Sequence, residues 1–184
     1  MFMFDLNSEI IQKLKDFRFL ELSADSILES FEDISRWPIH YLDGQQTVDV
    51  IDVNPMSLYR PDGYLNKDLV IEYYNRGHTL VVARVDLLTE ELRRYSNLIP
   101  SDIFLCINIY MSKGKSVISF PQHKHDYDVL VKNVRGSSTW IVDNKKIVLD
   151  NQNILCLPKH TNHQVIEIYE PKLSLTCNLP KFYT

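Results

Sequence analysis

Long apolar runs, a basic excess and an N-terminal leader pattern are all missing from this 184-residue chain. No apolar stretch approaches the roughly 20 residues that a membrane-spanning helix needs, so we expect no membrane partner. The chain carries 20 basic and 24 acidic residues and a net charge of −4, which excludes nucleic acid as an expected partner. The N-terminus lacks a basic region followed by an apolar run, so we expect no signal peptide.

Cysteine is also scarce. The three cysteines, Cys106, Cys156 and Cys177, lie in apolar, strand-like segments and form no Cys-x-x-Cys pair. Buried free thiols are typical of a reducing compartment, so we expect a cytoplasmic protein without disulfides.

Internal repeats, low-complexity tracts and linkers are absent too, while 45% of the residues are hydrophobic and 24% are charged. That balance is typical of a folded globular chain, and the length suits one domain over residues 1–184. Homodimerisation through N-terminal helices is one alternative for assembly, and packing of those helices on their own domain is the other.

Two kinds of hydrophobic periodicity divide this domain. In residues 1–100 the apolar spacing predicts helices at 7–17, 24–36, 65–75 and 89–98, with strands at 47–51 and 78–85. In residues 101–184 it predicts eight short strands, at 103–110, 116–120, 125–134, 139–142, 146–149, 154–157, 165–169 and 173–177. The expected fold is therefore mainly β, a double-stranded β-helix or jelly-roll barrel with the N-terminal helices packed on it.

Three histidines are the candidate chemical centre. His123 and His125 are two residues apart in an alternating segment, so on a strand both rings leave the same face, and His163 completes a trio. Three imidazole ligands leave open coordination positions on a divalent ion, as catalytic metal sites require. Zinc, manganese, nickel and copper bind three imidazoles as well as iron does, so the identity of the metal stays open. The alternative is that these are histidines satisfied within the barrel.

The sequence around the histidines resembles the two motifs of the cupin superfamily, in which a glycine turn, a strand, a proline and a histidine recur in order. Gly136 follows the first pair, and Pro158 precedes His163. Further stretches read YNRGHTL at 74–80, NIY at 108–110 and PKHTNH at 158–163. Over roughly residues 74–178 the chain thus resembles the Jumonji C oxygenases, and within them the ribosomal oxygenases.

The resemblance implies an iron(II) enzyme that uses 2-oxoglutarate and oxygen to hydroxylate a peptide or a small molecule. By position, the resemblance implies that His123 and His163 correspond to two iron ligands of the family. Asn178 falls where some members have a residue that contacts the cosubstrate. His160 stands where the family has glycine. The chain ends soon after His163, so we expect it to lack the C-terminal domains with which ribosomal oxygenases dimerise, and to take a smaller substrate.

Two positions depart from the family pattern. His125 stands where the family has its carboxylate ligand, which raises the formal charge of an iron(II) site from +1 to +2 and favours anionic ligands. Strand parity sends Asp126 and Asp128 to the opposite face, where we interpret them as a solvated strand edge, although a local bulge could bring Asp126 back.

Ser138 is the second departure. It stands where many relatives carry the Lys or Arg that pairs with the distal carboxylate of 2-oxoglutarate, a charge-assisted contact worth about 1.5–3 kcal/mol. Lys132 or Arg84 could replace that cation, and Tyr110 and Asn108 could donate or accept neutral hydrogen bonds.

Three functions therefore remain open. The first is an iron(II)/2-oxoglutarate hydroxylase, which the family likeness favours. The second is a three-histidine cupin enzyme that oxidises, isomerises or cleaves a directly chelated anionic substrate without 2-oxoglutarate, which His125 and Ser138 favour. The third is a binding module without catalysis.

Overall fold

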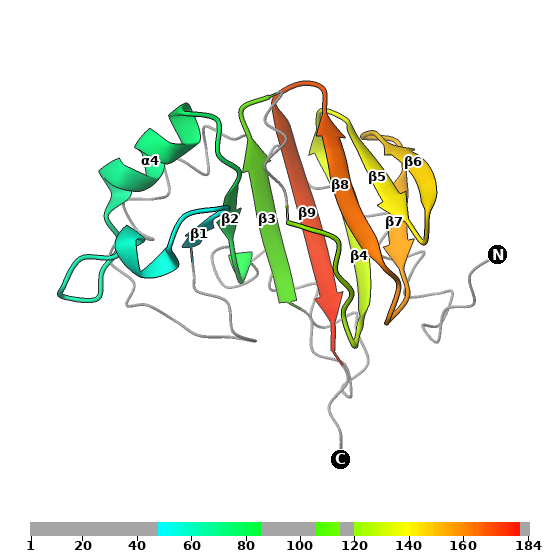
Figure 1. Ribbon diagram of the computed structural model, residues 1–184, viewed down its shortest axis with the longest axis horizontal. Helices are drawn as coiled ribbons and strands as arrows, with labels where there is room; N and C mark the ends of the chain where they lie inside the picture. Colours follow the sequence, from blue (N-terminus) through cyan, green and yellow to red (C-terminus); the bar gives the residue numbers. More distant parts are fainter. Residues whose placement is uncertain (1–47, 86–105, 115–119, 181–184) are drawn as a thin grey trace, which may run out of the picture.

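The computed structural model describes residues 48–85, 106–114 and 120–180 (Figure 1). The helices expected at 7–17, 24–36 and 89–98, and nearly all of the strand expected at 116–120, lie outside the described residues. The described strands are β1 (Val48–Val50), β2 (Leu80–Val82), β3 (Cys106–Ser112), β4 (Asp128–Arg135), β5 (Ser138–Val142), β6 (Lys145–Leu149), β7 (Ile154–Leu157), β8 (His163–Ile168) and β9 (Lys172–Leu179).

These strands form two antiparallel sheets. The larger has the order β1-β2-β3-β9-β4-β7, and the smaller has the order β6-β5-β8. Strand β9 lies between β3 and β4 and is hydrogen-bonded to both along most of its length (Figure 1). The expected mainly β, jelly-roll fold is confirmed.

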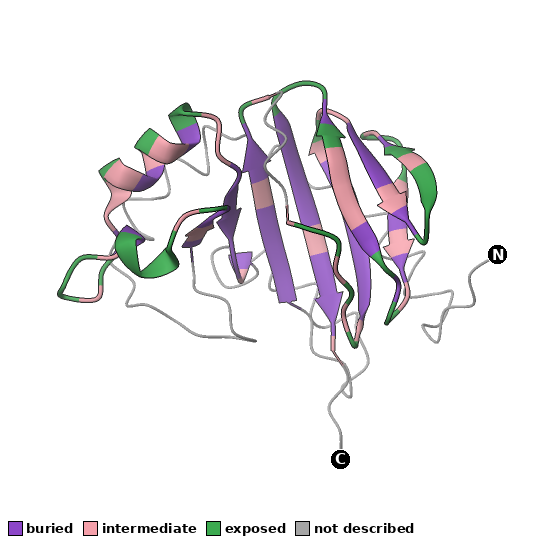
Figure 2. Ribbon diagram, in the orientation of Figure 1, coloured by how far each residue is buried: buried purple, intermediate pink, exposed green. Residues whose placement is uncertain are grey.

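Alternation along β9 divides its side chains between two environments. Leu173 and Leu175 belong to a core cluster that also holds Val70 and Tyr74 of helix α4 (Lys67–Asn75). Each fully buried leucine side chain there stabilises the fold by about 1.5–3 kcal/mol. The alternate residues of β9 turn to the other face of the sheet and line a pocket between the two sheets. The central strands are buried along almost their whole length (Figure 2).

A second apolar cluster joins the two sheets. It consists of buried residues from both, namely Val129, Val131, Trp140, Val142, Leu149, Leu155 and Leu157. Face-to-face packing of two sheets through interdigitated side chains is the sandwich arrangement. The polar face of β9 and the apolar cluster therefore bound one interior space.

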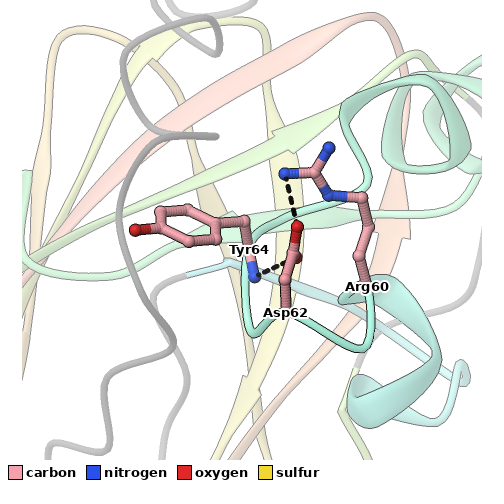
Figure 3. A network of polar contacts seen from close by, with 3 residues as sticks. All are labelled: Arg60, Asp62 and Tyr64. Carbon is pink, nitrogen blue, oxygen red and sulfur yellow. Dashed lines mark hydrogen bonds and ion pairs between the residues drawn. The ribbon is translucent and has the colours of Figure 1, made fainter.

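Helix α4 and its flanking loops cover the β1–β2 end of the larger sheet (Figure 1). The Asn66 side chain caps the helix by accepting a hydrogen bond from the Leu69 amide at 3.3 Å. In the preceding loop, the Asp62 carboxylate accepts from the Tyr64 amide at 3.1 Å and pairs with Arg60 at 3.2 Å (Figure 3). Both charged side chains are more than half exposed, so this pair contributes little beyond shaping the turn.

Among the described residues, no helix has the length and apolar character needed to traverse a bilayer. Cys106, Cys156 and Cys177 are free thiols, as expected, and two of them are fully buried.

Candidate metal centre

His123, His125 and His163 come together and line one pocket of the described structure. One ring nitrogen from each lies within 4.8 Å of the other two. The ring centroids are 4.3 Å apart for His123 and His163, 4.9 Å for His123 and His125, and 5.2 Å for His125 and His163.

The backbone that carries the first two histidines differs from the prediction. Strand β4 begins at Asp128 rather than at His125, so the expected common strand face for His123 and His125 is wrong. Instead His123 forms an isolated bridge with His163, the first residue of β8. The two main chains exchange hydrogen bonds of 3.1 and 2.9 Å, and this pairing brings the distant histidine to the other two.

Backbone carbonyls orient two of the rings. Nδ1 of His123 lies 2.9 Å from the Pro121 carbonyl oxygen, and Nδ1 of His163 lies 2.9 Å from the Thr161 carbonyl oxygen. A carbonyl oxygen only accepts hydrogen bonds, so each contact fixes the tautomer with the proton on Nδ1 and leaves Nε2 as the metal-binding atom. His125 is held differently, by stacking on Tyr127 at 4.9 Å with an interplanar angle of 13°.

Burial favours the neutral form of His125 and His163. Burial, followed by repulsion from His123 and His163, lowers the pKa of His125 to about 4. Burial also lowers the pKa of His163, although the hydrogen bond to Thr161 opposes that change. Metal binding requires the neutral imidazole, so the lowered pKa values of His125 and His163 favour the binding form of these two rings.

The pocket that the histidines help to line encloses about 580 Å³ when the open solvent at its opening is counted. Its apolar wall comes mainly from β4, β5, β7 and β8 and consists of Val129, Val131, Trp140, Leu157, Val165 and Ile168. Its more polar wall consists of Thr79, Tyr110, Lys172, Ser174 and Thr176.

Lys172 is the pocket residue that sequence reasoning missed. Its side chain is 5% exposed, and no residue of the described ranges forms a hydrogen bond or ion pair with its ammonium group. Burial lowers the pKa of Lys172 to about 8. The strand alternation K-L-S-L-T could have revealed it, because the leucines mark the core face and leave the lysine on the pocket face with Ser174 and Thr176.

Of the residues predicted to contact a cosubstrate, Tyr110 lines the pocket, while Asn108, Lys132, Ser138 and Asn178 are not among its lining residues. The Ser138 hydroxyl accepts hydrogen bonds from Asn133 at 3.2 Å and from the Trp140 indole at 3.0 Å. Lys132 follows the pocket-facing Val131 and alternates to the other side of β4. Their contact with a cosubstrate stays a prediction.

Asn108 and Arg84 form a local contact. The Asn108 side-chain oxygen accepts a hydrogen bond from the Arg84 amide at 3.1 Å, and Asn108 is fully buried. Arg84 is likewise outside the residues that line the pocket. Asn178 is buried as well, and its Oδ1 has no hydrogen-bond partner within the described part of the chain.

The interpretation of Asp128 as a solvated edge residue is wrong. It is 9% exposed, and its carboxylate accepts a hydrogen bond from the Lys159 amide at 2.8 Å. This bond ties the start of β4 to the turn that leads into His163. Asp126, in contrast, is exposed as expected.

His160 is exposed in this turn, and its amide donates a hydrogen bond of 2.6 Å to the His125 carbonyl oxygen. Its φ of 65° lies in the left-handed region, which explains in physical terms why the resembling family has glycine at this place.

Comparison with known proteins supports the architecture. No family model matches the chain, and no curated protein does. Among solved structures, YcfD, a ribosomal oxygenase from Escherichia coli in complex with cobalt and succinic acid, aligns with 91% of this chain at a TM-score of 0.57 and 18% identity. The chain has a cupin fold.

A cupin superfamily protein from Desulfitobacterium hafniense is 19% identical and aligns with 46% of this chain and 85% of its own, at a TM-score of 0.37. The alignment with YcfD covers 46% of that protein, so this chain spans less than half its length. At these identities the likeness concerns the fold. The three-histidine cluster within this fold could hold a metal ion.

Proposed function

We propose that the protein is a metal-dependent cupin oxygenase in which His123, His125 and His163 hold iron(II). The proposed reaction uses 2-oxoglutarate and oxygen to hydroxylate a peptide or a small metabolite. The observation that carries the proposal is the convergence of three imidazoles that line one pocket. The fold shared with YcfD, whose structure contains cobalt and succinic acid, supports it further.

The donor set fits a divalent ion. Two Nε2 atoms are presented by backbone hydrogen bonds to Nδ1, and burial disfavours the protonated rings that would repel a cation. Three protein ligands on an octahedral ion leave three positions for small ligands. When bound, iron(II) supplies activation of oxygen and of a chelated oxoacid.

The remaining side chains shape the reaction space. The apolar wall around Trp140 and Leu157 limits water beside the histidines, which strengthens electrostatic interactions within the site. Tyr110 adds a hydroxyl group to the pocket lining, where it can orient a polar ligand.

A second candidate is a three-histidine enzyme that acts on a directly chelated anionic substrate without 2-oxoglutarate. Ser138 favours it, because its hydroxyl is engaged with Asn133 and Trp140 and so supports packing rather than cosubstrate binding. The neutral His125 in place of a carboxylate favours it too, since the resulting +2 centre attracts anionic ligands more strongly.

One experiment separates the candidates. The protein is loaded anaerobically with iron(II), oxygen is admitted, and succinate formed from 2-oxoglutarate is measured in the wild type, in His123→Ala and in His160→Asn. The last variant is a matched control, because His160 lies outside the cluster and asparagine tolerates its positive φ.

Succinate formation that is lost in His123→Ala and retained in His160→Asn supports the oxygenase. Bound metal without succinate formation, together with a change in the metal's spectrum on adding a small anionic compound, supports the second candidate. Wild-type protein that binds no metal contradicts both.

A further inference from the structure

His125 differs from the other two histidines in what orients its ring. Nδ1 of His123 and Nδ1 of His163 each lie 2.9 Å from a backbone carbonyl oxygen, which fixes both rings. Within the described part of the chain, neither ring nitrogen of His125 forms a hydrogen bond. A metal ligand without such a bond must be oriented by another contact, because ordering a free side chain on binding costs affinity.

Tyr127 supplies that contact. Its ring centroid lies 4.9 Å from that of His125, and the two rings are nearly parallel, with an interplanar angle of 13°. Aromatic rings stacked at this separation attract one another beyond the effect of the apolar area that they bury. Such a stack limits the tilt of the imidazole and leaves its ring nitrogens available to an ion.

The backbone on either side of the stack is held by the turn before β8. The His160 amide donates a hydrogen bond of 2.6 Å to the His125 carbonyl oxygen. The Lys159 amide donates one of 2.8 Å to the carboxylate of Asp128, the residue after Tyr127. The main-chain positions of both rings are therefore set before any metal binds.

The ring of Tyr127 is itself held by the apolar cluster that joins the two sheets. It is half-buried and packs against this cluster, whose members include Val129 and Trp140. Close packing leaves a side chain few alternative rotamers. Tyr127 therefore connects the interior between the sheets to His125.

Tyr127 is not among the residues that line the pocket, whereas His125 is. A small molecule in the pocket would thus meet the imidazole and not the tyrosine ring. Any influence of Tyr127 on the metal centre passes through His125.

We propose that Tyr127 is a positioning residue of the metal centre, whose ring holds the His125 imidazole in the orientation that it presents to the ion. This assignment rests on the metal site of the proposed function, but not on 2-oxoglutarate or oxygen. It divides the three ligands by their support, because the backbone orients His123 and His163 while an aromatic side chain orients His125.

Two substitutions of Tyr127 test the role of its ring. Tyr127→Phe keeps the ring and removes the hydroxyl group, whereas Tyr127→Leu removes the ring and keeps an apolar side chain. In cobalt(II) titrations we expect Tyr127→Phe to bind as the wild type does and Tyr127→Leu to bind about three- to tenfold more weakly. The visible cobalt spectrum of Tyr127→Leu should change towards that of His125→Ala. Equal losses in both variants overturn the proposal, because the hydroxyl group would then carry the effect.

A double-mutant cycle separates positioning from a general effect on the fold. In a His125→Ala background, Tyr127→Leu should weaken cobalt(II) binding by less than about twofold, because the ring that it positions is gone. A loss as large as in the wild-type background overturns the proposal. Tyr73→Leu is the matched control and should leave binding unchanged, since Tyr73 is also half-buried and its ring contacts His78, outside the metal centre, at 5.2 Å.

An NMR measurement on metal-free protein separates this proposal from the proposed function. We expect through-space contacts between the ring protons of His125 and Tyr127 in the wild type, and a loss of order in the His125 ring alone in Tyr127→Leu. That result supports the positioning of His125 even if cobalt(II) does not bind and the proposed function fails. Absence of the contacts in the wild type overturns the proposal whether or not the variants fold, and it leaves the proposed function standing.

Discussion

The main chains of His123 and His163 are paired by two hydrogen bonds, with the His123 amide 3.1 Å from the His163 oxygen and the His163 amide 2.9 Å from the His123 oxygen. Each ring is additionally held through Nδ1 by a carbonyl two residues before it. The same backbone that joins the two segments therefore also orients the two rings. We expect this pair to remain ordered without metal, because none of these bonds involves an ion.

Replacing Lys172 by methionine should stabilise the ligand-free protein. Burial lowers the pKa of Lys172 from 10.5 to about 8. That difference corresponds to about 3 kcal/mol of destabilisation at pH 7. The methionine side chain is apolar and of similar length, so Lys172→Met should raise the free energy of unfolding by up to this amount in urea denaturation.

The pH dependence of this effect has a defined sign. Below the folded pKa of about 8 the lysine is charged in both states, and its burial lowers the free energy of unfolding. Between that value and 10.5 the unfolded chain binds more protons, so the free energy of unfolding rises with pH. The advantage of Lys172→Met should therefore shrink across this window. An advantage that is independent of pH would contradict a buried, unpaired ammonium.

Asp128→Ala should weaken both the fold and the metal centre. It removes the carboxylate that accepts the Lys159 amide and leaves that donor unsatisfied. Loss of a hydrogen bond to a charged group costs about 1.5–3 kcal/mol. Because the turn leads to His163, cobalt(II) affinity should fall with stability, as calorimetry and urea denaturation can measure. Asp126→Ala, at an exposed position, should change neither quantity.

Gly136→Ala should destabilise the turn between β4 and β5. The new methyl group would meet backbone atoms of Pro171 and Lys172 that have no flexible end to move aside. The positive φ adds strain of about 1–2 kcal/mol for a residue with a Cβ. Thermal unfolding should show a loss of more than about 2 kcal/mol in total. A neutral result would mean that the start of β9 is not fixed by this contact.

His160→Gly should have the opposite effect. His160 also has a positive φ, but it is exposed, so glycine removes strain without removing packing. Glycine also increases the entropy of the unfolded chain, which leaves an expected net gain of about 0.5–1 kcal/mol. Urea denaturation measures it, and a loss of stability would show that the exposed imidazole makes a contact of its own.

The sequence predicted the fold class and the cluster for identifiable reasons. The apolar run at 154–157 placed β7 at its observed bounds, and short apolar segments located β5, β6, β8 and β9 to within a few residues. The spacing of His123 and His125 correctly indicated that their rings lie close together, although the backbone between them is not a strand.

Two features escaped prediction because they depend on pairing between distant segments. Strand β4 starts at Asp128, where pairing with Leu179 of β9 begins, and no local propensity marks that position. Lys172 was overlooked because a lysine at the start of a strand is usually solvated. It is buried here because β9 lies between two other strands of the larger sheet.

The most direct test of the central claim is a cobalt(II) titration of the wild type and of His123→Ala, His125→Ala and His163→Ala, with His160→Asn as the control. The account predicts one ion per wild-type chain, unchanged binding in the control, and a loss of affinity of at least about tenfold in each alanine variant. Alanine variants that fold and bind cobalt(II) as tightly as the wild type would contradict it.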